Sequence, residues 1–495
     1  MMANPLTRRI TEVLALAPQS RAIEFEGDWS TWAEVGDQAR RIATVVAQHG
    51  GSHPQVGVLL RNTPAHVATF LGLILAEATL VVINPARGDD RTRDDIAALG
   101  LPIVIGTADD LAALVRTSDS MTAVTVSTLT EPPRLSPCPT PISADTRPGV
   151  AVRMLTSGTT GPPKRIDLTY DMLARSALGA NPEAATAPAE PRRGVAIVNA
   201  PLVHIGGVYR VLQCVTEARP FVLLPRFELQ RWAQMVREHR PKAVSLVPAA
   251  LRMVLHSDLT RDDLAGVRAV TSGTAPLSAE DADAFTDKFG IPVLTSYAAT
   301  EFGGGVAGWS LADHTRYWHD KRGSVGRATL GAKLRVIDDD GNPVDPGVPG
   351  LLEVKPGQLD PDAGWIRTTD LARIDEDGFL WILGRADQAI VRGGFKVMPD
   401  DVRLALEAHP AVAGAAVVGR PDERLGETPV AMVELRTESN TDTDEIADFL
   451  RTRLARYEVP TEIAIVDTIP RTPSGKADLG AVRAHFAASR GGHGG

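Results

Sequence analysis

The sequence is poor in cysteine, carries no excess of basic charge and contains no uninterrupted apolar run of membrane-spanning length. With only Cys138 and Cys214 in 495 residues, neither a disulfide framework nor a cysteine-ligated metal site is expected. The formal net charge of −9 argues against a broad nucleic-acid-binding surface. The longest apolar stretch, 66–85, is interrupted by Glu77, and its β-branched end predicts a helix followed by a buried strand.

Residues 1–18 lack the apolar core of a signal peptide, and their apolar side chains recur at helical spacing. We therefore expect a cytoplasmic protein with no membrane span and no nucleic-acid partner. Hydrophobic residues make up 43% of the chain and charged residues 23%, which is typical of a folded soluble protein. Because 495 residues exceed the usual size of a single core, two or more domains are expected. The oligomeric state, monomer or homodimer, stays open.

Hydrophobic patterning divides the chain into regions of different fold class. Short β-branched runs alternate with helical patterns through the first three quarters, which predicts a largely parallel α/β architecture. From about Leu330, closely spaced strands and turns predict a small β-rich subdomain. The predicted organisation is a large N-terminal α/β domain that includes this subdomain over 1–384, a boundary segment over 385–388, a small α+β C-terminal domain over 389–488 and a disordered tail over 489–495.

The segment 156–164, TSGTTGPPK, combines flexible backbone, hydroxyl groups and one cation in a single loop. Glycines without a Cβ let backbone N–H groups approach phosphate oxygens, hydroxyls add donors and the lysine adds charge. The spacing differs from that of a Walker A loop. We interpret the loop as a polyphosphate site, and an ordinary turn with a solvated lysine is the alternative. The contributing residues are Thr156, Ser157, Gly158, Thr159, Thr160, Gly161 and Lys164.

This loop is one of five segments that occur in a characteristic order and spacing. The others are SYAATE at 296–301, GWIRTTDL at 364–371, GRADQAIVRGGFKVMPDDV at 384–402 and PRTPSGK at 470–476. Together they resemble the signatures of the adenylate-forming superfamily, which contains acyl-CoA synthetases, peptide-synthetase adenylation domains and firefly luciferase. The resemblance spans nearly the whole chain. It implies a mobile C-terminal domain and a ligase with ATP and CoA as co-substrates and Mg²⁺ as cofactor, acting through an acyl-adenylate.

The same resemblance implies roles for residues around the phosphates. The loop 156–164 would hold the β- and γ-phosphates, while Lys476 would reach the α-phosphate and the carboxylate of the acid. Glu301 would bind Mg²⁺ together with Thr160, and Thr300 would contact the α-phosphate. Judged from local sequence alone, an exposed lysine and a surface glutamate are the alternatives.

For the nucleoside, the resemblance implies that Tyr297 packs on adenine, that Asp370 accepts hydrogen bonds from both ribose hydroxyls and that Arg385 supports the same sugar. The segment 273–276 also fits a strand-to-helix turn with Ser278 as the N-cap, and both roles can hold. The residues implied to line the adenine site are Gly273, Thr274, Ala275, Ser296 and Ala298.

Three residues depart from the family pattern. Arg165 follows the loop lysine where glycine is usual, Ala298 replaces the glycine after Tyr297, and Thr369 replaces the glycine before Asp370. None of these changes removes a charged or catalytic group, so the departures bear on backbone geometry and on the fit of ATP.

Two segments bear on the acid. His204 occupies a position that resembles the aromatic gate of acyl- and aryl-CoA ligases. No aspartate occurs there to pair with an α-amino group, which disfavours an amino-acid substrate. Glycines near His204 remove side-chain volume, so a long or bulky acid is expected. The alternatives are a core histidine, and glycines that serve backbone turning or close packing. The glycines concerned are Gly206, Gly207, Gly303, Gly304 and Gly305.

The second half-reaction is implied by the resemblance to follow rotation of the C-terminal domain about a hinge over 385–388, at Asp387. The rotation would replace Lys476 by a face for pantetheine, formed by Arg392, Gly393, Gly394 and Lys396; a tight turn is the alternative for the two glycines. CoA and a carrier-protein phosphopantetheine present the same thiol, so both remain possible partners.

The sequence therefore predicts an AMP-forming carboxylic acid:CoA ligase for a medium- or long-chain acid or a bulky aryl or polycyclic one. An enzyme that loads a carrier protein and a non-catalytic acyl-adenylate-binding protein are the alternatives.

Overall fold

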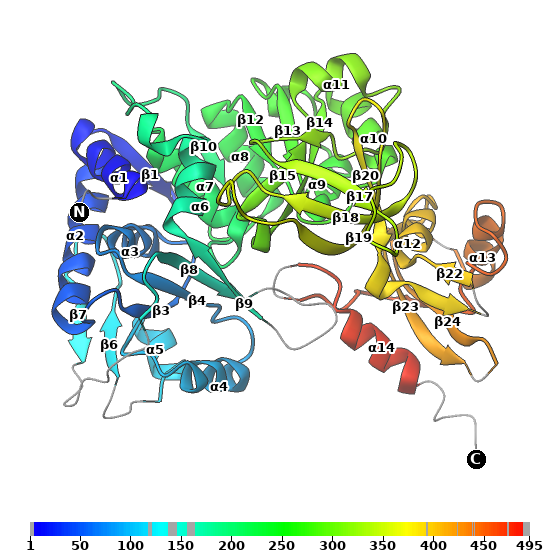
Figure 1. Cartoon of the computed structure of the whole chain (residues 1–495), viewed down its shortest axis with the longest axis horizontal. Helices are drawn as coiled ribbons and strands as arrows, with labels where there is room; N and C mark the ends of the chain where they lie inside the picture. The colour runs from blue at the N-terminus through cyan, green and yellow to red at the C-terminus, as the bar shows by residue number, and fades with distance from the viewer. Residues whose placement is uncertain are drawn as a thin grey trace.

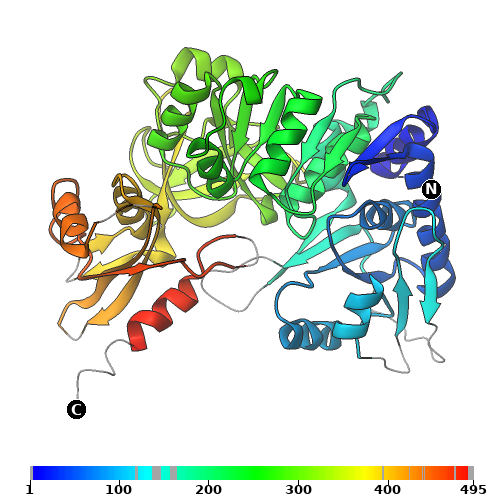
Figure 2. The same ribbon diagram turned by 180° about the vertical axis from the view of Figure 1, so that it is seen from behind.

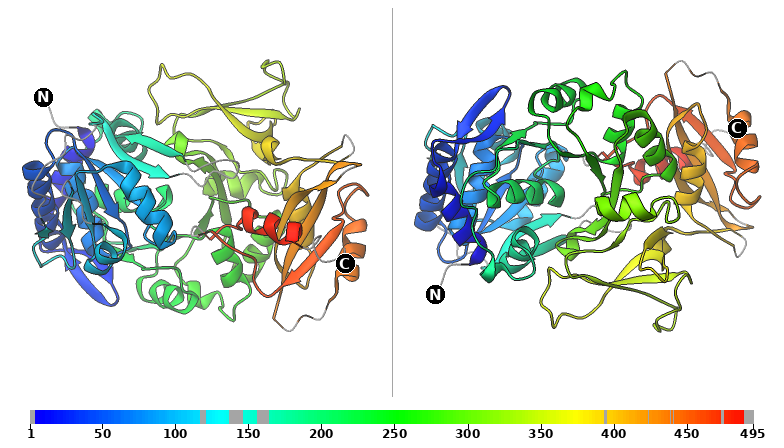
Figure 3. Two further views of the ribbon diagram at one scale, coloured as in Figure 1. Left: turned by 90° about the horizontal axis from the view of Figure 1, so that it is seen from below. Right: turned by 90° about the horizontal axis from the view of Figure 1, so that it is seen from above.

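The structure, a computed structural model, describes residues 4–116, 121–136, 146–155, 164–392, 395–422, 424–437, 439, 441–472 and 475–488. The N-terminal part lies at one end of an elongated molecule and the C-terminal part at the other, with the middle of the chain between them (Figures 1 and 3).

The N-terminal part is built around a seven-stranded sheet of order β7-β6-β5-β3-β4-β8-β9. Strand β3 pairs in parallel with β4 on one side and with β5 on the other. All residues of the three strands are buried, as expected of strands covered on both faces. The strands are β3 Gln55–Leu59, β4 Thr79–Ile83, β5 Ile103–Gly106, β6 Thr122–Thr125, β7 Arg134–Ser136, β8 Val150–Leu155 and β9 Arg165–Thr169; the helices are α2 Trp32–His49, α3 Pro64–Leu75, α4 Asp89–Leu99 and α5 Ala108–Leu114.

The apolar stretch 66–85 forms the buried helix α3 and then strand β4, as predicted. Thr63 caps α3 by accepting a hydrogen bond from the His66 N–H, and Pro64 occupies its first turn. None of the helices in the described part of the chain combines the length and the apolarity needed to cross a membrane.

Two further sheets are built mainly from the middle of the chain, and β1 and β2 from near its start join the first of them. One has the order β10-β11-β1-β2 and the other the order β12-β13-β14-β15-β16, in which β12 to β14 are parallel and β15 is antiparallel to β14. The strands are β1 Arg21–Phe25, β2 Asp28–Thr31, β10 Ala196–Val198, β11 Phe221–Leu223, β12 Ala243–Ser245, β13 Ala269–Ser272, β14 Val293–Ala299, β15 Gly304–Gly308 and β16 Arg327–Ala328. The helices are α1 Pro5–Leu16, α6 Tyr170–Leu178, α7 Ile205–Thr216, α8 Leu229–His239, α9 Pro248–Leu255, α10 Ala279–Phe289 and α11 Leu311–Tyr317, with short 3₁₀ turns η1 Pro182–Ala184, η2 Asp262–Leu264 and η3 Thr300–Phe302.

The strands expected after about Leu330 form an antiparallel sheet of order β17-β18-β19-β20. Its buried side chains pack with Phe302 and Val306, so this sheet is attached to the end of β14 and to β15 through a shared core. The strands are β17 Lys333–Ile337, β18 Gly350–Lys355, β19 Ile366–Ile374 and β20 Leu380–Arg385, followed by η4 Ala386–Gln388.

The C-terminal part has its own sheet, of order β22-β21-β24-β23, with β25 added in parallel beside β24. Two apolar cores lie in it, one with α12 and α13 and one with α14. The elements are β21 Ile390–Arg392, β22 Phe395–Val397, α12 Pro399–Glu407, β23 Val412–Asp422, β24 Gly426–Leu435, α13 Thr443–Arg451, β25 Glu462–Val466 and α14 Leu479–Ala488. The predicted fold class, a large α/β domain with a small α+β domain, is confirmed; the exact boundaries remain predictions.

Candidate active site

The phosphate loop lies between β8 and β9, and its predicted residues Thr156 to Gly161 lie outside the described residues. Lys164, at its end, is exposed. Arg165, which stands where the family has glycine, opens β9 and is buried down to 9% side-chain exposure. It donates hydrogen bonds to the Val82 carbonyl at 3.0 Å and to Asp95 at 2.5 Å. The arginine therefore anchors the strand after the loop to β4 and α4.

Strands β14 and β19 bring the predicted adenine and ribose residues together. The Tyr297 hydroxyl donates a hydrogen bond to the Asp370 carboxylate. Burial raises the pKa of Asp370, although this hydrogen bond and the charge of Arg385 oppose the shift. Burial and the Asp370 charge raise the pKa of Tyr297. The carboxylate predicted to bind ribose is thus already paired with the neighbouring tyrosine.

Arg385 is placed next to Asp370 by the register of β19 and β20, in which the two residues are directly paired. Its guanidinium makes a bidentate ion pair with Asp387, at 2.9 Å from Nε to Oδ1 and 2.8 Å from Nη2 to Oδ2. One arginine therefore lies between the predicted ribose ligand and the predicted hinge residue.

The segment 273–276 follows β13 and approaches β14 closely. A Cβ on Gly273 would lie 2.8 Å from the Ser296 hydroxyl oxygen, and Thr274 has a φ of 71°, in the left-handed region. Ser278 caps α10 by accepting a hydrogen bond from the Asp281 N–H at 3.1 Å, as predicted. Ala275 follows in the same turn. The strand-to-helix turn therefore holds the backbone of residues 273–276 close to β14.

Thr300 and Glu301 lie in the 3₁₀ turn η3, between β14 and β15. Glu301 is exposed, and its carboxylate makes no hydrogen bond or ion pair with another described residue. Ala298, the other departure in this segment, pairs with Gly305 across the two strands. A free carboxylate oxygen suits a hard cation shared with phosphate oxygens, so Glu301 fits a role in binding Mg²⁺.

Lys476 is held in a tight hairpin of the C-terminal part. The Thr472 N–H donates to the Lys476 carbonyl at 2.7 Å, and Gly475 supplies a φ of +80° at the turn. The segment leading into α14 runs back toward β9 in both views (Figures 1 and 2). The Lys476 side chain keeps access to solvent, but surrounding protein and the positive charge of Arg385 lower its pKa.

His204 lies at the start of α7, and its buried Nε2 atom has no hydrogen-bond partner among the described residues. Burial and the positive charge of Lys476 lower the pKa of His204. Lys476 is therefore close to His204 as well as to Arg385. The three predicted residues come from separate segments of the chain and lie in one region of the structure.

The predicted pocket glycines fall into two groups. A Cβ on Gly206 or Gly305 would meet nothing within 4 Å, so both face open space. A Cβ on Gly207 would lie 2.2 Å from the Pro201 carbonyl oxygen. Gly303 and Gly304 have φ values of +70° and +140°, which side chains rarely adopt. Close packing thus explains the glycine at position 207, and backbone conformation explains those at positions 303 and 304.

Three residues near these glycines were missed by sequence reasoning. The Tyr209 and Ser176 hydroxyls both donate to the Gly303 carbonyl, and Met172 lies against the same glycine. Burial raises the pKa of Tyr209 to about 12. Tyr209 could have been found, because it follows Gly206 by three residues and shares its helix face. Ser176 and Met172 come from α6, and no local pattern links them to the site.

The predicted pantetheine segment is described only in part: Gly393, Gly394 and the Lys396 side chain lie outside the described residues. Arg392 donates hydrogen bonds to the Tyr457 carbonyl at 2.7 Å and to the Val459 carbonyl at 3.3 Å. Phe395 is 56% exposed and stacks on the Tyr457 ring with centroids 4.6 Å apart. The arginine thus supports the fold of the C-terminal part in this orientation.

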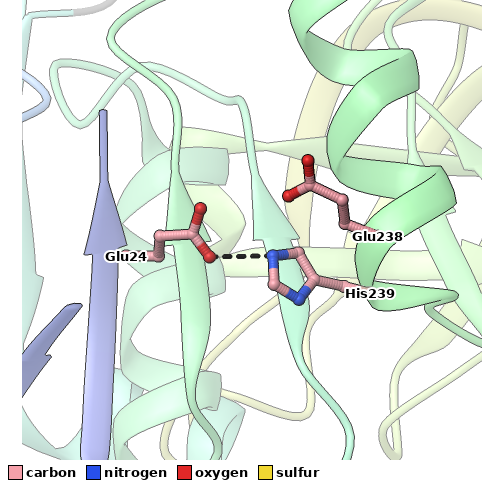
Figure 4. A group of neighbouring side chains, drawn as sticks. All are labelled: Glu24, Glu238 and His239. Atoms are coloured by element: carbon pink, nitrogen blue, oxygen red, sulfur yellow. Dashed lines mark ion pairs between the residues drawn. The ribbon is translucent and has the colours of Figure 1, made fainter. Parts of the chain in front are cut away.

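One cluster of three potential metal ligands occurs among the described residues, on β1 and α8 (Figure 4). His239 Nε2 is 2.8 Å from an oxygen of the buried Glu24. The Glu238 carboxylate accepts a hydrogen bond from Gln234 at 2.8 Å. The contact between Glu24 and His239 joins strand β1 to the end of α8.

A comparison with known proteins identifies the family. The sequence model of the AMP-binding enzyme family matches residues 10–359, and that of the AMP-binding enzyme C-terminal domain matches residues 404–476. The fold is thus that of an adenylate-forming enzyme. The chain belongs to the AMP-binding enzyme family and, within it, to the acyl-CoA synthetase type of AMP-forming acid–thiol ligases.

Two curated relatives cover almost the whole chain. An indoleacetate–CoA ligase of Aromatoleum aromaticum is 28% identical, with 97% of each chain covered. A feruloyl-CoA synthase of an Amycolatopsis species is 30% identical, with 95% of this chain and 97% of the relative covered.

Among solved structures, the chain is similar to MatB from Rhodopseudomonas palustris in two states. The ATP-bound structure gives a TM-score of 0.82 at 24% identity, over 98% of this chain and 99% of that one. The apo structure gives a TM-score of 0.69 at 25% identity over the same shares. The arrangement of the present chain is therefore closer to that of the ATP-bound structure.

Proposed function

We propose that the protein is an ATP-dependent CoA ligase for an aryl carboxylic acid, and that the structure presents it in the orientation that forms the acyl-adenylate. One observation carries the proposal: Lys476 of the C-terminal part lies near enough to His204 of the large domain for its charge to lower the histidine pKa, and the charge of Arg385, at the end of β20, lowers the pKa of Lys476. The lysine implied to act in adenylation is thus at the site where the acid and the nucleotide would meet.

The chemistry demands positive charge at this point. A carboxylate must approach the α-phosphate, and two unit charges about 4 Å apart repel by roughly 4 kcal/mol at an effective dielectric near 20. Lys476 offsets this repulsion and orients the attacking oxygen, while the loop 156–164 with Lys164 holds the departing pyrophosphate. Magnesium, bound by Glu301 and Thr160 with phosphate oxygens, would neutralise further charge. Thr300 lies beside Glu301 and serves the α-phosphate.

Nucleoside binding uses the Tyr297–Asp370 pair. Asp370 exchanges the tyrosine hydroxyl for the ribose hydroxyls, and the freed tyrosine ring packs on adenine. Backbone at Gly273, Thr274 and Ala275 lines the opposite side, near Ser296 and Ala298. Arg385 keeps positive charge beside the sugar, which opposes the rise that burial causes in the pKa of Asp370.

The acid lies between the start of α7 and β15. His204 is neutral at neutral pH because burial and Lys476 lower its pKa, so it borders the pocket without attracting the carboxylate away from the α-phosphate. Gly206 and Gly305 leave open space for a ring. An aryl acid is favoured over an aliphatic one because the relatives that cover the chain are named for indoleacetate and ferulate.

In the second half-reaction, the small domain turns about Asp387 and withdraws Lys476. The face with Arg392, Gly393, Gly394 and Lys396 then admits the pantetheine thiol, which attacks the acyl carbonyl and releases AMP. CoA is the proposed acceptor, since the relatives are named as CoA ligases and CoA synthases. A carrier-protein thiol would follow the same path and is an outcome of the test.

The test is pyrophosphate release from ATP with a panel of acids, measured with and without CoA. We expect 4-coumarate, ferulate and indoleacetate to support release and, with CoA, to yield the thioester, while acetate gives little of either. Release without any thioester would indicate a different acceptor. Absence of release with every aryl acid would refute the proposed substrate class, and Lys476→Ala serves as the inactive control.

A further inference from the structure

Arg252, on helix α9 of the large domain, lies between two carboxylates from different parts of the chain. Its Nε atom is 2.7 Å from Asp281 of α10, and its Nη2 atom is 2.7 Å from Glu407 of α12. The side chains are 18% exposed for Arg252 and Asp281 and 9% exposed for Glu407. Water therefore screens the contact less than it screens an ordinary surface ion pair.

The Arg252–Glu407 contact joins the large domain to the small domain. Among ion pairs between described residues, it is the one whose members lie on opposite sides of the predicted hinge 385–388. Glu407 ends helix α12, and α12 packs on strand β23 and contacts β20. The pair therefore joins the two domains through residues that belong neither to the hinge nor to the hairpin of Lys476.

Each member keeps a second partner inside its own domain. Arg252 retains Asp281, while Glu407 also pairs with Arg403 at 2.7 Å, which in turn pairs with Asp400 at 3.0 Å. When an ordinary buried ion pair is broken, each charge is left without a counter-ion, and this is costly. Separation of Arg252 from Glu407 avoids that cost because each charge keeps its second partner. The Arg252–Glu407 ion pair can therefore break and re-form without leaving an unpaired charge.

We propose that Arg252 and Glu407 are positioning residues that hold the small domain in the adenylating orientation and so place Lys476 at His204 and Arg385. They release it when the domain rotates for thioester formation. The inference rests on the proposed function for its catalytic consequence, but the pair makes a structural prediction that needs no substrate.

The structural test measures the distance between the domains in the full chain. Spin labels are attached at Asp287→Cys on α10 and Thr452→Cys after α13, in a Cys138→Ser background, and Cys214 is buried and unreactive. We expect one dominant distance in the parent and a second, substantially populated one after Glu407→Gln or Arg252→Gln. The control is Arg237→Gln, which breaks a 2.8 Å pair with Asp263 inside the large domain. If the Glu407→Gln distribution matches that of the parent and the control, the proposal is wrong.

The kinetic test uses 4-coumarate and the two half-reactions. For Glu407→Gln we expect pyrophosphate release to fall about tenfold, within the usual range for coupled sites, while thioester formation from supplied coumaroyl-adenylate and CoA is unchanged or faster. The double variant Arg252→Gln/Glu407→Gln loses little more than either single variant, because both remove one contact. Equal loss in both half-reactions overturns the proposal. A parent inactive on aryl acids would refute the proposed substrate class, and the spin-label distances would still decide the role of the pair.

Discussion

Asp370 is paired within the protein through the group that the proposed ribose contact would use. In the structure, its carboxylate accepts the Tyr297 hydroxyl, which stands in for the ribose hydroxyls expected from the motif. The motif predicted both residues but not their bond. That bond arises from the placement of β14 beside β19, which no local sequence pattern encodes.

We predict that Asp370→Ala lowers kcat/KM for ATP by about ten- to a hundredfold, since hydrogen bonds to a charged group contribute roughly 1.5–3 kcal/mol. Tyr297→Phe keeps the ring and frees the carboxylate, so we expect ATP to bind it at least as tightly as the parent. Isothermal titration and steady-state kinetics measure both effects. Equal losses in the two variants would show that the pair acts only as a structural unit.

The lowered pKa of Lys476 gives a prediction of pH dependence. The lysine must be charged to act, so kcat/KM for pyrophosphate release declines as pH rises through a pKa below the ordinary 10.5. Arg385→Gln removes a positive neighbour and moves this decline to higher pH, even though overall activity falls. Arg335→Gln, in the β17–β20 sheet, is the control and should not change the pH at which kcat/KM declines. A shift to lower pH with Arg385→Gln would contradict the proximity of the two residues.

The glycines near His204 lead to a size test. Because a Cβ on Gly206 meets nothing within 4 Å, we predict that Gly206→Leu lowers the rate with 4-coumarate at least tenfold and leaves any slow turnover of acetate nearly unchanged. Gly206→Ala is the control for helix effects. Equal loss with both acids would place the acyl group elsewhere. Gly304 is unsuitable for this test because its φ of +140° strains any side chain.

At the scale of elements, the sequence predicted most strands and helices that carry the site. The apolar stretch 66–85 predicted α3 and β4, and the dense strands after about Leu330 predicted β17 to β20. It treated five glycines alike, although Gly207 is explained by contact with Pro201 and Gly206 by open space. Such differences depend on which element packs against each glycine, so a one-dimensional pattern could not separate them.

Helix α3 carries a buried histidine whose titration affects stability. Burial lowers the pKa of His66 from 6.5 to about 4, and Thr63 lies 2.8 Å from its Nδ1 atom. Between these values the unfolded chain binds more protons than the folded one, so stability is full above pH 6.5 and is lost as pH falls toward 4.

We predict that His66 contributes about 2 kcal/mol to the fall in unfolding free energy between pH 7.5 and pH 5. His66→Gln should be less stable at pH 7.5 yet lose correspondingly less on acidification. Urea unfolding followed by tryptophan fluorescence at the two pH values measures this difference, and His49→Gln on the exposed end of α2 is the control. Identical pH dependence in His66→Gln and the parent would show that other groups cause the loss.

For the whole molecule, the orientation of the small domain could not be predicted from sequence. The motifs predicted residues such as Tyr297, Asp370 and Arg385, which the structure brings together. The orientation is set by long-range contacts such as Arg252 with Glu407, whose members are separated by 155 positions and belong to no motif. The closer likeness to the ATP-bound MatB structure agrees with this arrangement.

The two-orientation scheme yields a direct prediction. Lys476→Ala removes the charge that serves adenylation, so we expect acid-dependent pyrophosphate release to fall by at least a hundredfold. Thioester formation from supplied coumaroyl-adenylate and CoA should stay within about threefold of the parent. Rapid-quench measurements of each half-reaction decide the point, and comparable loss in both would reject separate orientations.

The position of Lys476 also bears on how substrates enter. In the proposed adenylating orientation, the small domain places Lys476 near His204 and Arg385, where the acid and the nucleotide would meet. Nucleotide and acid must then arrive during brief openings, and the frequency of those openings sets an upper limit on their association rates. The contact between Arg252 and Glu407, which aids the chemical step once substrates are bound, would at the same time slow their entry.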